Sequence, residues 1–228
     1  MYWQEESQQA PQPAPIDEVV DVSYPLAGGT LPVDHAYALL AALLQVLPWL
    51  EDEPAAGVHG IHVAASQNGW YRPDEASGGV LHLSRRTRMT LRIPRGRLPD
   101  LEAVRGARLD VAGHPLVVGE PVVRPLLPMP TLFARQVASQ ATEEAFVESA
   151  AGELRALGVR PRKLLCGMVG GVRTPAGTLL TRSLMVADLD REESLQIQRH
   201  GLGPERRLGC GIFVPHKGIG PVRRSDDR

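Results

Sequence analysis

One side chain near the start of the chain could take up a proton at neutral pH. His35 lies in the first turn of a mostly apolar segment, residues 32–47, that predicts a helix. The positive end of the helix macrodipole disfavours the imidazolium form, so this imidazole is expected to be neutral near pH 7 and able to act as a general base. The adjacent Asp34 works in the opposite direction, because a carboxylate stabilises the charged form. A histidine at a helix start is also typical of a surface or capping residue, and both interpretations stay open.

A segment near the C-terminus could bind phosphate. It spans residues 201–215, and its candidate contacts are Gly201, Gly203, Arg206, Arg207, Gly209 and Gly211. Glycines leave backbone N–H groups uncovered and allow close approach, and guanidinium groups bind phosphate bidentately. The segment therefore predicts a site for a phosphate-rich polymer. A long turn between a helix and a strand is the alternative that needs no ligand.

The basic residues are unevenly distributed, although the formal net charge is −1. No Lys or Arg precedes Arg72, and only Lys163 and Lys217 are lysines. The basic residues concentrate at 85–97 and 206–228, where further candidate contacts with a polyanion are Arg85, Arg86, Arg88 and Lys217. Arg86, Arg88 and Arg92 share the parity of a predicted strand and would line one face of it. A solvated sheet face and a coding bias toward arginine are the alternatives.

Composition excludes several classes of function. Aromatic residues make up 4% of the chain, so base stacking is not the main mode of nucleic-acid binding. Cys166 and Cys210 lie far apart without a CxxC pattern, which argues against a zinc knuckle and a disulfide scaffold and favours a reducing, cytoplasmic location. No apolar run is long enough to span a membrane, and the polar, Gln/Pro-rich residues 1–15 predict a disordered tail. No cofactor is expected.

The elements that must position these residues occur twice in the same order. The first half predicts strands at 17–24, 58–63 and 88–93, a helix at 32–47 capped by Thr30, a short helix at 98–104, and paired strands at 108–118 and 121–126. The second half predicts a strand at 132–138, a helix from Thr142 to Gly158, strands at 163–169 and 178–186, a helix opened by an Asp190/Glu193 capping box, and a last strand at 212–214. The predicted fold is α+β with two tandem ferredoxin-like (βαββαβ, RRM-like) units, residues 16–126 and 127–217, followed by a flexible basic tail at 218–228.

The order of elements and four short segments resemble a known family. The segments are 31–37 (LPVDHAY), 83–93, 109–116 (LDVAGHPL) and 209–216 (GCGIFVPH). Together they are similar to the myxobacterial-type subtype of the CRISPR repeat-processing endoribonucleases, over about residues 19–217. The resemblance implies an enzyme that cuts precursor CRISPR RNA within its repeats without a metal, and that can stay with the guide RNA among interference-complex subunits. It places the catalytic histidine at His35 and suggests Tyr37 as its partner, although the two lie about 200° apart around a helix.

The chemistry that this implies needs few protein groups. RNA carries its own nucleophile, the 2′-OH, so an enzyme needs to align the backbone, accept the 2′ proton and neutralise the charge on the phosphorane. The products would be a 2′,3′-cyclic phosphate and a 5′-OH. A metal site is not expected: His59 and His62 would face opposite sides of a strand, with no acidic cluster beside them. A non-catalytic repeat-RNA-binding subunit and a protein–protein module with the same fold stay open as alternatives.

Overall fold

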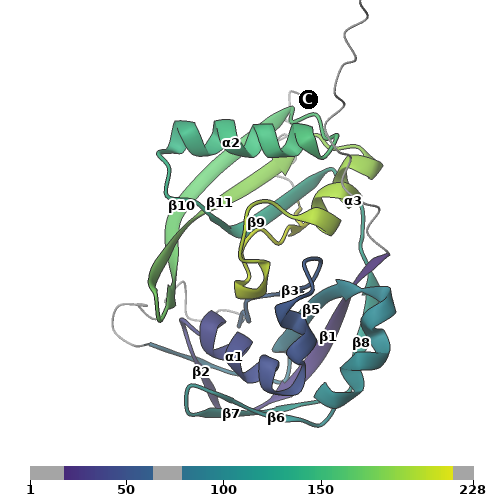
Figure 1. Cartoon of the computed structure of the whole chain (residues 1–228), viewed down its shortest axis with the longest axis vertical. Coiled ribbons are helices and arrows are strands. Elements are labelled where there is room, and N and C mark those ends of the chain that lie inside the picture. Colours follow the sequence, from purple (N-terminus) through teal and green to yellow (C-terminus); the bar gives the residue numbers. More distant parts are fainter. Residues whose placement is uncertain (1–17, 64–78, 218–228) are drawn as a thin grey trace, which may run out of the picture.

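The computed structural model describes residues 18–63 and 79–217 (Figure 1). The predicted tails at 1–15 and 218–228 lie outside the described residues. Two antiparallel sheets lie one above the other along the long axis of the molecule, the first built from residues 19–125 and the second from residues 131–215.

The first unit has a sheet in the order β3-β5-β1-β7-β6, with β8 also paired to β1. Its alternating apolar residues pack against α1 to form the larger core. A separate two-stranded sheet pairs β2 with β4. The elements are β1 (Val19–Ala27), β2 (Thr30–Pro32), α1 (Ala36–Val46), the 3-10 helix η1 (Pro48–Glu51), β3 (Gly57–Val58), β4 (Val80–His82), β5 (Arg88–Pro94), the 3-10 helix η3 (Arg95–Val104), β6 (Arg108–Val111), β7 (His114–Val118) and β8 (Val122–Pro125).

The second unit has a sheet in the order β10-β11-β9-β12, with α2 across its outer side (Figure 1). Its elements are β9 (Thr131–Ala138), α2 (Glu143–Ala156), β10 (Lys163–Thr174), β11 (Gly177–Ala187), α3 (Arg191–His200), the 3-10 helix η4 (Arg206–Leu208) and β12 (Val214–Pro215). The local signals predicted here are confirmed: Thr142 caps α2, and Asp190 and Glu193 form the capping box of α3. Both units combine helices with an antiparallel sheet, and the fold is α+β with two tandem ferredoxin-like units, as predicted.

Four sequence-based predictions for the first unit are wrong in a boundary, a strand pairing or a helix type. The helix expected from residue 32 starts at Ala36, because Thr30–Pro32 pairs with Val80–His82 across the sheet and Thr30 is therefore not a cap. The strand expected at 58–63 is only Gly57–Val58. The strand after Gly119 pairs with β1 rather than with its sequence neighbour β7. The helical segment expected at 98–104 is a 3-10 helix from Arg95. In the second unit, the last strand is Val214–Pro215 rather than 212–214.

The predicted row of exposed arginines on β5 is also wrong. Arg86 lies in the turn before the strand, Arg88 is exposed, and Arg92 is fully buried. Arg92 donates to both carboxylate oxygens of Asp21 at 2.8 and 2.9 Å, and to the backbone oxygens of Gln198 and Phe213 at 3.0 and 2.8 Å. Since Asp21 belongs to β1 and the two carbonyls belong to the second unit, this guanidinium ties the two units together.

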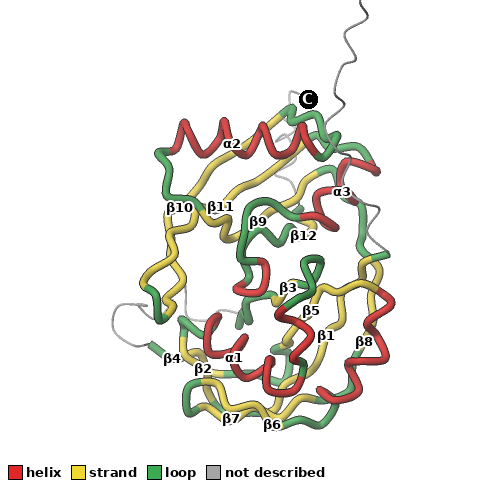
Figure 2. The backbone as a smooth tube through the Cα atoms, viewed as in Figure 1, coloured by secondary structure: helices red, strands yellow, loops and turns green. Residues whose placement is uncertain are grey.

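The glycine-rich segment also lies between the two units. It descends from α3 to β3 and α1 (Figure 1), and η4 and the loops beside it run between the two sheets (Figure 2). Leu208 and Cys210 form a small apolar cluster with Val172 of β10, against which Ala36 and Leu40 of α1 pack. Burial raises the pKa of the Cys210 thiol to about 12, so this cysteine behaves as a small apolar side chain.

The Asp21–Arg92 ion pair predicts that the free energy of unfolding decreases at acid pH. Burial opposes ionisation of Asp21, but the two hydrogen bonds from Arg92, together with the nearby His59 ring, outweigh it and hold the pKa of Asp21 well below its ordinary value. A carboxylate with a lowered folded-state pKa stabilises the fold above its unfolded pKa, about 3.9, and loses this contribution as the pH falls below it. We expect the difference in unfolding free energy between wild type and Asp21→Asn to narrow as the pH falls from 5 to 3, measured by urea unfolding.

The exposed Glu18 provides the control for this titration. Its pKa is also lowered, by its hydrogen bond with Arg95, but this pair lies in solvent. The Glu18→Gln variant should therefore follow wild type closely at every pH. An Asp21→Asn difference that stays constant from pH 5 to pH 3 would show that the carboxylate charge does not stabilise the fold.

Candidate active site

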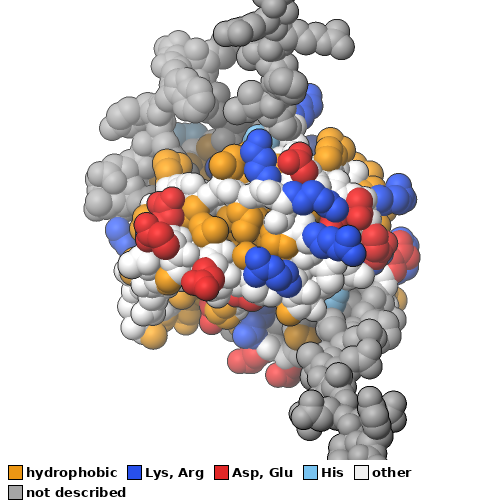
Figure 3. Space-filling view, turned by 90° about the horizontal axis from the view of Figure 1, so that it is seen from above, with side chains coloured by type: hydrophobic (Ala, Val, Ile, Leu, Met, Phe, Trp, Pro, Cys, Tyr) orange, Lys and Arg blue, Asp and Glu red, His pale blue; other side chains and the backbone are white. Residues whose placement is uncertain are grey.

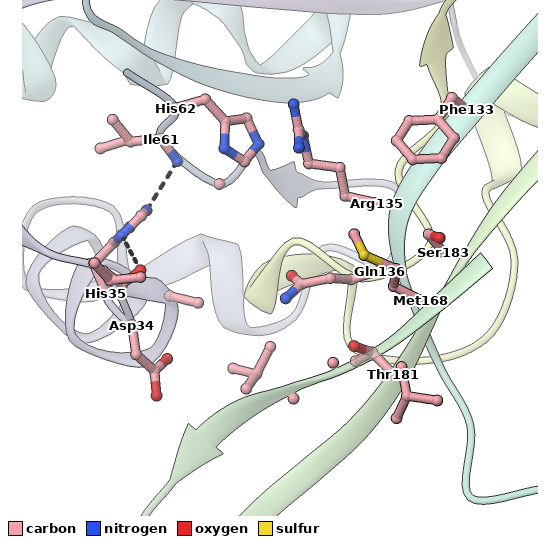
Figure 4. Close-up of a pocket in the computed structure, with 17 residues that line it drawn as sticks. Asp34, His35, Ile61, His62, Phe133, Arg135, Gln136, Met168, Thr181 and Ser183 are labelled. Atoms are coloured by element: carbon pink, nitrogen blue, oxygen red, sulfur yellow. Dashed lines mark hydrogen bonds between the residues drawn. The ribbon is translucent and has the colours of Figure 1, made fainter. Parts of the chain in front are cut away.

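A pocket of about 280 Å³ opens between the two units. One wall comes from the start of α1 and the loop after β3, and the other from β9, β10 and β11. Figure 4 shows side chains from both walls directed into this space. The polar lining consists of Asp34, His35 and His62 on the first wall and Arg135, Gln136, Thr181 and Ser183 on the second. The pocket thus gathers a carboxylate, imidazoles, a guanidinium and hydroxyls, which makes it the candidate active site.

Two β-bulges shape the wall made by the sheet. Between Leu184 and Arg182 of β11, the single residue Ser183 faces two residues on each neighbouring strand. On β9 these residues are Arg135 and Gln136, and on β10 they are Gly167 and Met168. A bulge disrupts the alternation of a strand and redirects a side chain. As a result, Arg135 and Gln136 both line the pocket although they are adjacent in sequence.

The floor of the pocket carries an unsatisfied hydroxyl. Thr181 is 1% exposed, and its Oγ1 has no hydrogen-bond partner among the described residues. A buried polar group without a partner is costly, so a ligand atom at this position would relieve a penalty. Both features of the wall, the bulges and the hydroxyl, point to a site built for a polar ligand.

His35 is held rigidly on the opposite wall. It is the residue before α1, not part of its first turn, and it makes no side-chain cap. It is 5% exposed, and its Nε2 accepts the backbone N–H of Ile61 at 2.9 Å. Its Nδ1 lies 2.9 Å from the Pro32 oxygen and 3.1 Å from the Val33 oxygen. Because Nε2 accepts a hydrogen bond, the ring proton is on Nδ1, which donates a hydrogen bond to these carbonyls. The imidazole is therefore neutral.

The histidines of the loop after β3 point in different directions. His59 is buried beside Asp21, with Nε2 3.4 Å from the carboxylate, and desolvation lowers the pKa of His59. His62 is exposed and lines the pocket (Figure 4). The two side chains are therefore not a metal-binding pair. Within residues 18–63 and 79–217, no group of three His, Cys, Asp or Glu side chains could hold a metal ion.

Asp34 connects the two walls of the pocket. One of its carboxylate oxygens accepts the backbone N–H of Arg173 at 3.3 Å and lies 3.6 Å from the Arg173 Nε. Tyr37, the predicted partner of His35, is 42% exposed and does not line the pocket. It lies instead in a shallow depression that it shares with Asp34 and Arg173. The structure therefore does not bring Tyr37 and His35 into one site.

The glycine-rich segment has no uncovered glycine N–H groups, contrary to the sequence-based expectation. The N–H groups of Gly201, Gly203, Gly209 and Gly211 donate respectively to Ile197, the Glu153 carboxylate, Arg206 and Gln136. All four glycines have positive φ angles. The glycines are needed because the chain folds tightly on itself and packs against β3 and β9, not because a phosphate must approach.

The two arginines of this segment are also used internally. Arg206 is 8% exposed and donates from Nη1 to the Arg199 and His200 oxygens at the end of α3, at 2.7 Å each. Burial, together with the nearby charge of Arg92, lowers the pKa of Arg206 to about 10. Arg207 is half-buried and donates to the Glu51 oxygen of the first unit. Neither guanidinium lies in the pocket.

The other predicted RNA contacts remain at the surface. Arg85 and Arg86 are exposed in the turn before β5, and Arg88 is exposed at the first position of β5, where it donates to the Arg85 oxygen at 2.8 Å. Lys217 is exposed after β12. None of them lines the pocket, so a polyanion would reach them only by extending beyond it.

The α2 side of the molecule does not form a continuous basic face. Acidic and basic side chains both occur there, separated by apolar ones (Figure 3). This side therefore offers no extended cationic surface to a polyanion. Among the described residues, no helix is long and apolar enough to cross a membrane.

Sequence reasoning missed His62 as a pocket residue and missed Arg135 entirely. A strand over residues 58–63 places His62 on the opposite sheet face from His59 and gives it no role in a pocket. A signal for Arg135 was present: two adjacent polar residues, Arg135 and Gln136, interrupt the apolar alternation of residues 132–138. Such an interruption is typical of a bulge. Which partner strand the bulge faces, and hence where the side chain points, depends on the tertiary structure.

Comparisons with known proteins give relatives in sequence and in fold. The CRISPR-associated endonuclease Cas6 of Myxococcus xanthus (strain DK1622) is 35% identical over 198 residues, which cover 86% of this chain and 81% of that protein. The solved product of a Cas6-related gene from Pyrococcus furiosus has a TM-score of 0.59 at 11% identity and covers 86% of this chain and 97% of its own. A solved RAMP protein that binds different RNA substrates has a TM-score of 0.60 at 13% identity and covers 86% of this chain and 98% of its own. These two structures share the fold.

The family assignment rests on the match along the chain. A family model described as Cas6 Crispr matches residues 20–218, which include both ferredoxin-like units and every element around the pocket. Together with the identity to the Myxococcus protein, this shows that the chain belongs to the Cas6 family.

Proposed function

We propose that this protein cuts precursor CRISPR RNA within its repeats by a metal-independent reaction of the RNA's own 2′-OH. Membership of the Cas6 family supports RNA processing, since the Myxococcus relative is a CRISPR-associated endonuclease. The RAMP protein of the same fold binds RNA. The observation that carries most weight in this structure is the pocket between the units, where imidazole, guanidinium and hydroxyl groups converge from two walls.

The groups of the pocket match the needs of phosphodiester transesterification. In this reaction the 2′-oxygen forms a bond to phosphorus as its proton leaves, and the bond from phosphorus to the 5′-oxygen breaks. The 5′-oxygen then takes up a proton, so the products are a 2′,3′-cyclic phosphate and a 5′-OH. An imidazole can accept the 2′ proton, and a guanidinium can stabilise the added negative charge on the phosphorane. Hydroxyl and amide groups such as Thr181 and Gln136 can hold the phosphate oxygens.

The role of His35 as general base stays a prediction. The imidazole is neutral, as the base must be, but the Ile61 N–H already occupies its Nε2 lone pair. For His35 to accept a proton, this hydrogen bond has to break, which leaves a buried N–H unsatisfied at a cost of about 1–3 kcal/mol. RNA binding would have to compensate for this loss.

RNA binding is proposed to extend from the pocket to the surrounding cations. Arg85, Arg86, Arg88 and Lys217 are the exposed candidates for contacts with the repeat backbone. Because Arg206 and Arg207 hold the fold together through carbonyl groups, we expect their substitution to affect stability as well as RNA affinity. After cleavage, the protein is proposed to keep the guide RNA and to carry it to interference-complex subunits.

The test is cleavage of an end-labelled cognate repeat in the presence of EDTA. We expect one cut within the repeat, with a 2′,3′-cyclic phosphate on the upstream product. A repeat with a single 2′-deoxy nucleotide before the cut should bind with unchanged affinity and remain uncleaved, because it lacks the nucleophile. Product retention is read in the same assay: the reaction should stop at about one cut per protein molecule.

Three outcomes would contradict this function. Cleavage of the 2′-deoxy repeat would exclude the 2′-OH as nucleophile. Cleavage that requires added Mg²⁺ would exclude the metal-independent reaction. Binding of the repeat without cleavage, with or without metal, would identify the protein as the non-catalytic repeat-RNA-binding subunit.

A further inference from the structure

The loop after β3 is fixed to the start of α1 by one hydrogen bond. The Ile61 N–H donates to His35 Nε2, and the ring is fixed in turn by the Pro32 and Val33 carbonyls. Ile61 is 1% exposed and belongs to the core of the first unit. Residues 59–63 form no helix or strand. The buried Ile61 side chain and the hydrogen bond from the Ile61 N–H nevertheless fix the backbone immediately before His62. His62 is the exposed imidazole that this arrangement presents to the pocket (Figure 4).

The opposite wall is shaped to present a guanidinium. Arg135 lies in the β9 bulge opposite Ser183, and in Figure 4 its side chain extends toward the wall that carries His62. The bulge is held in place by the Gly211 N–H, which donates to the Gln136 oxygen at 2.7 Å. The second bulge, at Gly167 and Met168, faces the same Ser183 from the other side. The bulges therefore place Arg135 in the pocket.

From this geometry we propose that His62 accepts the 2′ proton and Arg135 stabilises the phosphorane, while His35 is a positioning residue that holds the His62 loop. This assignment rests on the proposed function. His35 is buried and its two ring nitrogens both contact backbone groups, whereas His62 is exposed in the same pocket. In the reaction, the proton of the 2′-OH moves to His62 as the oxygen–phosphorus bond forms. The 5′-oxygen leaves and takes its proton from solvent.

Single-turnover cleavage in EDTA by the full chain distinguishes the two histidines. We expect His62→Ala to slow cleavage by about 100-fold or more, and Arg135→Ala to slow it by about 100-fold. Both variants should bind the 2′-deoxy repeat as wild type does. The control is His82→Ala, which removes an exposed histidine outside the pocket and should cleave at the wild-type rate.

The pH profile separates a catalytic role from a positioning role. The titratable and charged groups that line the pocket with His62 are Asp34, His35 and Arg135. The wild-type rate should rise with pH along a limb that reports loss of a proton from the base. This limb should persist in His35→Gln, in which an amide oxygen can accept the Ile61 N–H, and should vanish in His62→Ala. Added imidazole should restore part of the activity of His62→Ala, because its site is open to solvent.

Each result has a defined meaning. Wild-type protein that does not cleave in EDTA contradicts the proposed function itself. Wild-type protein that cleaves, with His62→Ala equally fast, contradicts only the assignment of His62. A limb that vanishes in His35→Gln and persists in His62→Ala identifies His35 as the base. Thermal unfolding of each variant shows whether a slow rate reflects lost structure, which we expect for His35→Ala but not for His62→Ala.

Discussion

Replacement of Arg92 by methionine is expected to lower the free energy of unfolding by about 3–5 kcal/mol. The methionine fills part of the space but leaves the Asp21 carboxylate without its bidentate partner. It also leaves the Gln198 and Phe213 oxygens without a donor. Because these carbonyls belong to the second unit, the loss weakens the contact between the units as well as the first sheet. Urea unfolding at pH 7 measures the change.

A matched control lies three residues away. Arg95 makes the same kind of paired hydrogen bonds to the Glu18 carboxylate, at 2.7 and 2.9 Å, but both side chains are about half exposed. Water and salt screen an exposed pair, so Arg95→Met should be indistinguishable from wild type in unfolding experiments. Equal losses in the two variants would mean that burial does not set the importance of the Arg92 pair.

A double variant tests the cause of the Arg92 effect. If an unpaired buried carboxylate is responsible, Asp21→Leu combined with Arg92→Met should recover part of the stability that Arg92→Met loses. If the lost bonds to Gln198 and Phe213 dominate, the double variant should be no more stable than the single one. The comparison therefore separates the ion pair from the connection between the units.

Replacement of Gly211 by alanine is expected to destabilise the protein by about 4 kcal/mol or more. Gly211 has a φ of +66°, and a Cβ there would lie 2.0 Å from the Leu202 oxygen. That oxygen is backbone, so no side-chain rotation relieves the clash. The same residue anchors the β9 bulge through Gln136, so RNA cleavage should fall together with stability.

Gly113 is the control for the backbone conformation alone. Its φ is +81°, and a Cβ there would have nothing within 4 Å. The Gly113→Ala variant should therefore show only the left-handed conformational penalty, about 1–2 kcal/mol. Thermal and urea unfolding of both variants give the comparison. If Gly211→Ala loses no more than Gly113→Ala, the segment rearranges easily and does not fix the bulge.

The order of elements was largely readable from the sequence. Helix α2 and the capping box of α3 follow from contacts within a few residues, at Thr142 and at Asp190 with Glu193. The strand errors have a common cause. The true partners of residues 30–32 and 122–125 lie far away in the sequence, at 80–82 and 20–23. A local pattern contains no information on such pairing, so propensity favoured a longer helix and a local hairpin.

The chemistry of the candidate site was less readable. Arginines in sequence clusters looked alike, yet Arg92 and Arg206 are buried between the units while Arg85 and Arg86 are exposed. The glycine-rich segment looked like a phosphate cradle, yet its glycine N–H groups are all bonded within the protein. Burial depends on which surfaces meet, and neither residue type nor spacing specifies that.

The sequence by itself determined the two α+β units and pointed to the family, because alternation, caps and short motifs are local properties. It also singled out His35. Only the tertiary structure showed that His35 is fully hydrogen-bonded, and only the pairing of β9, β10 and β11 through two bulges placed Arg135 opposite His62. These residues come from both units and are far apart in the sequence. Their positions follow from the packing of the two units, and a local sequence pattern does not specify which distant segments come into contact.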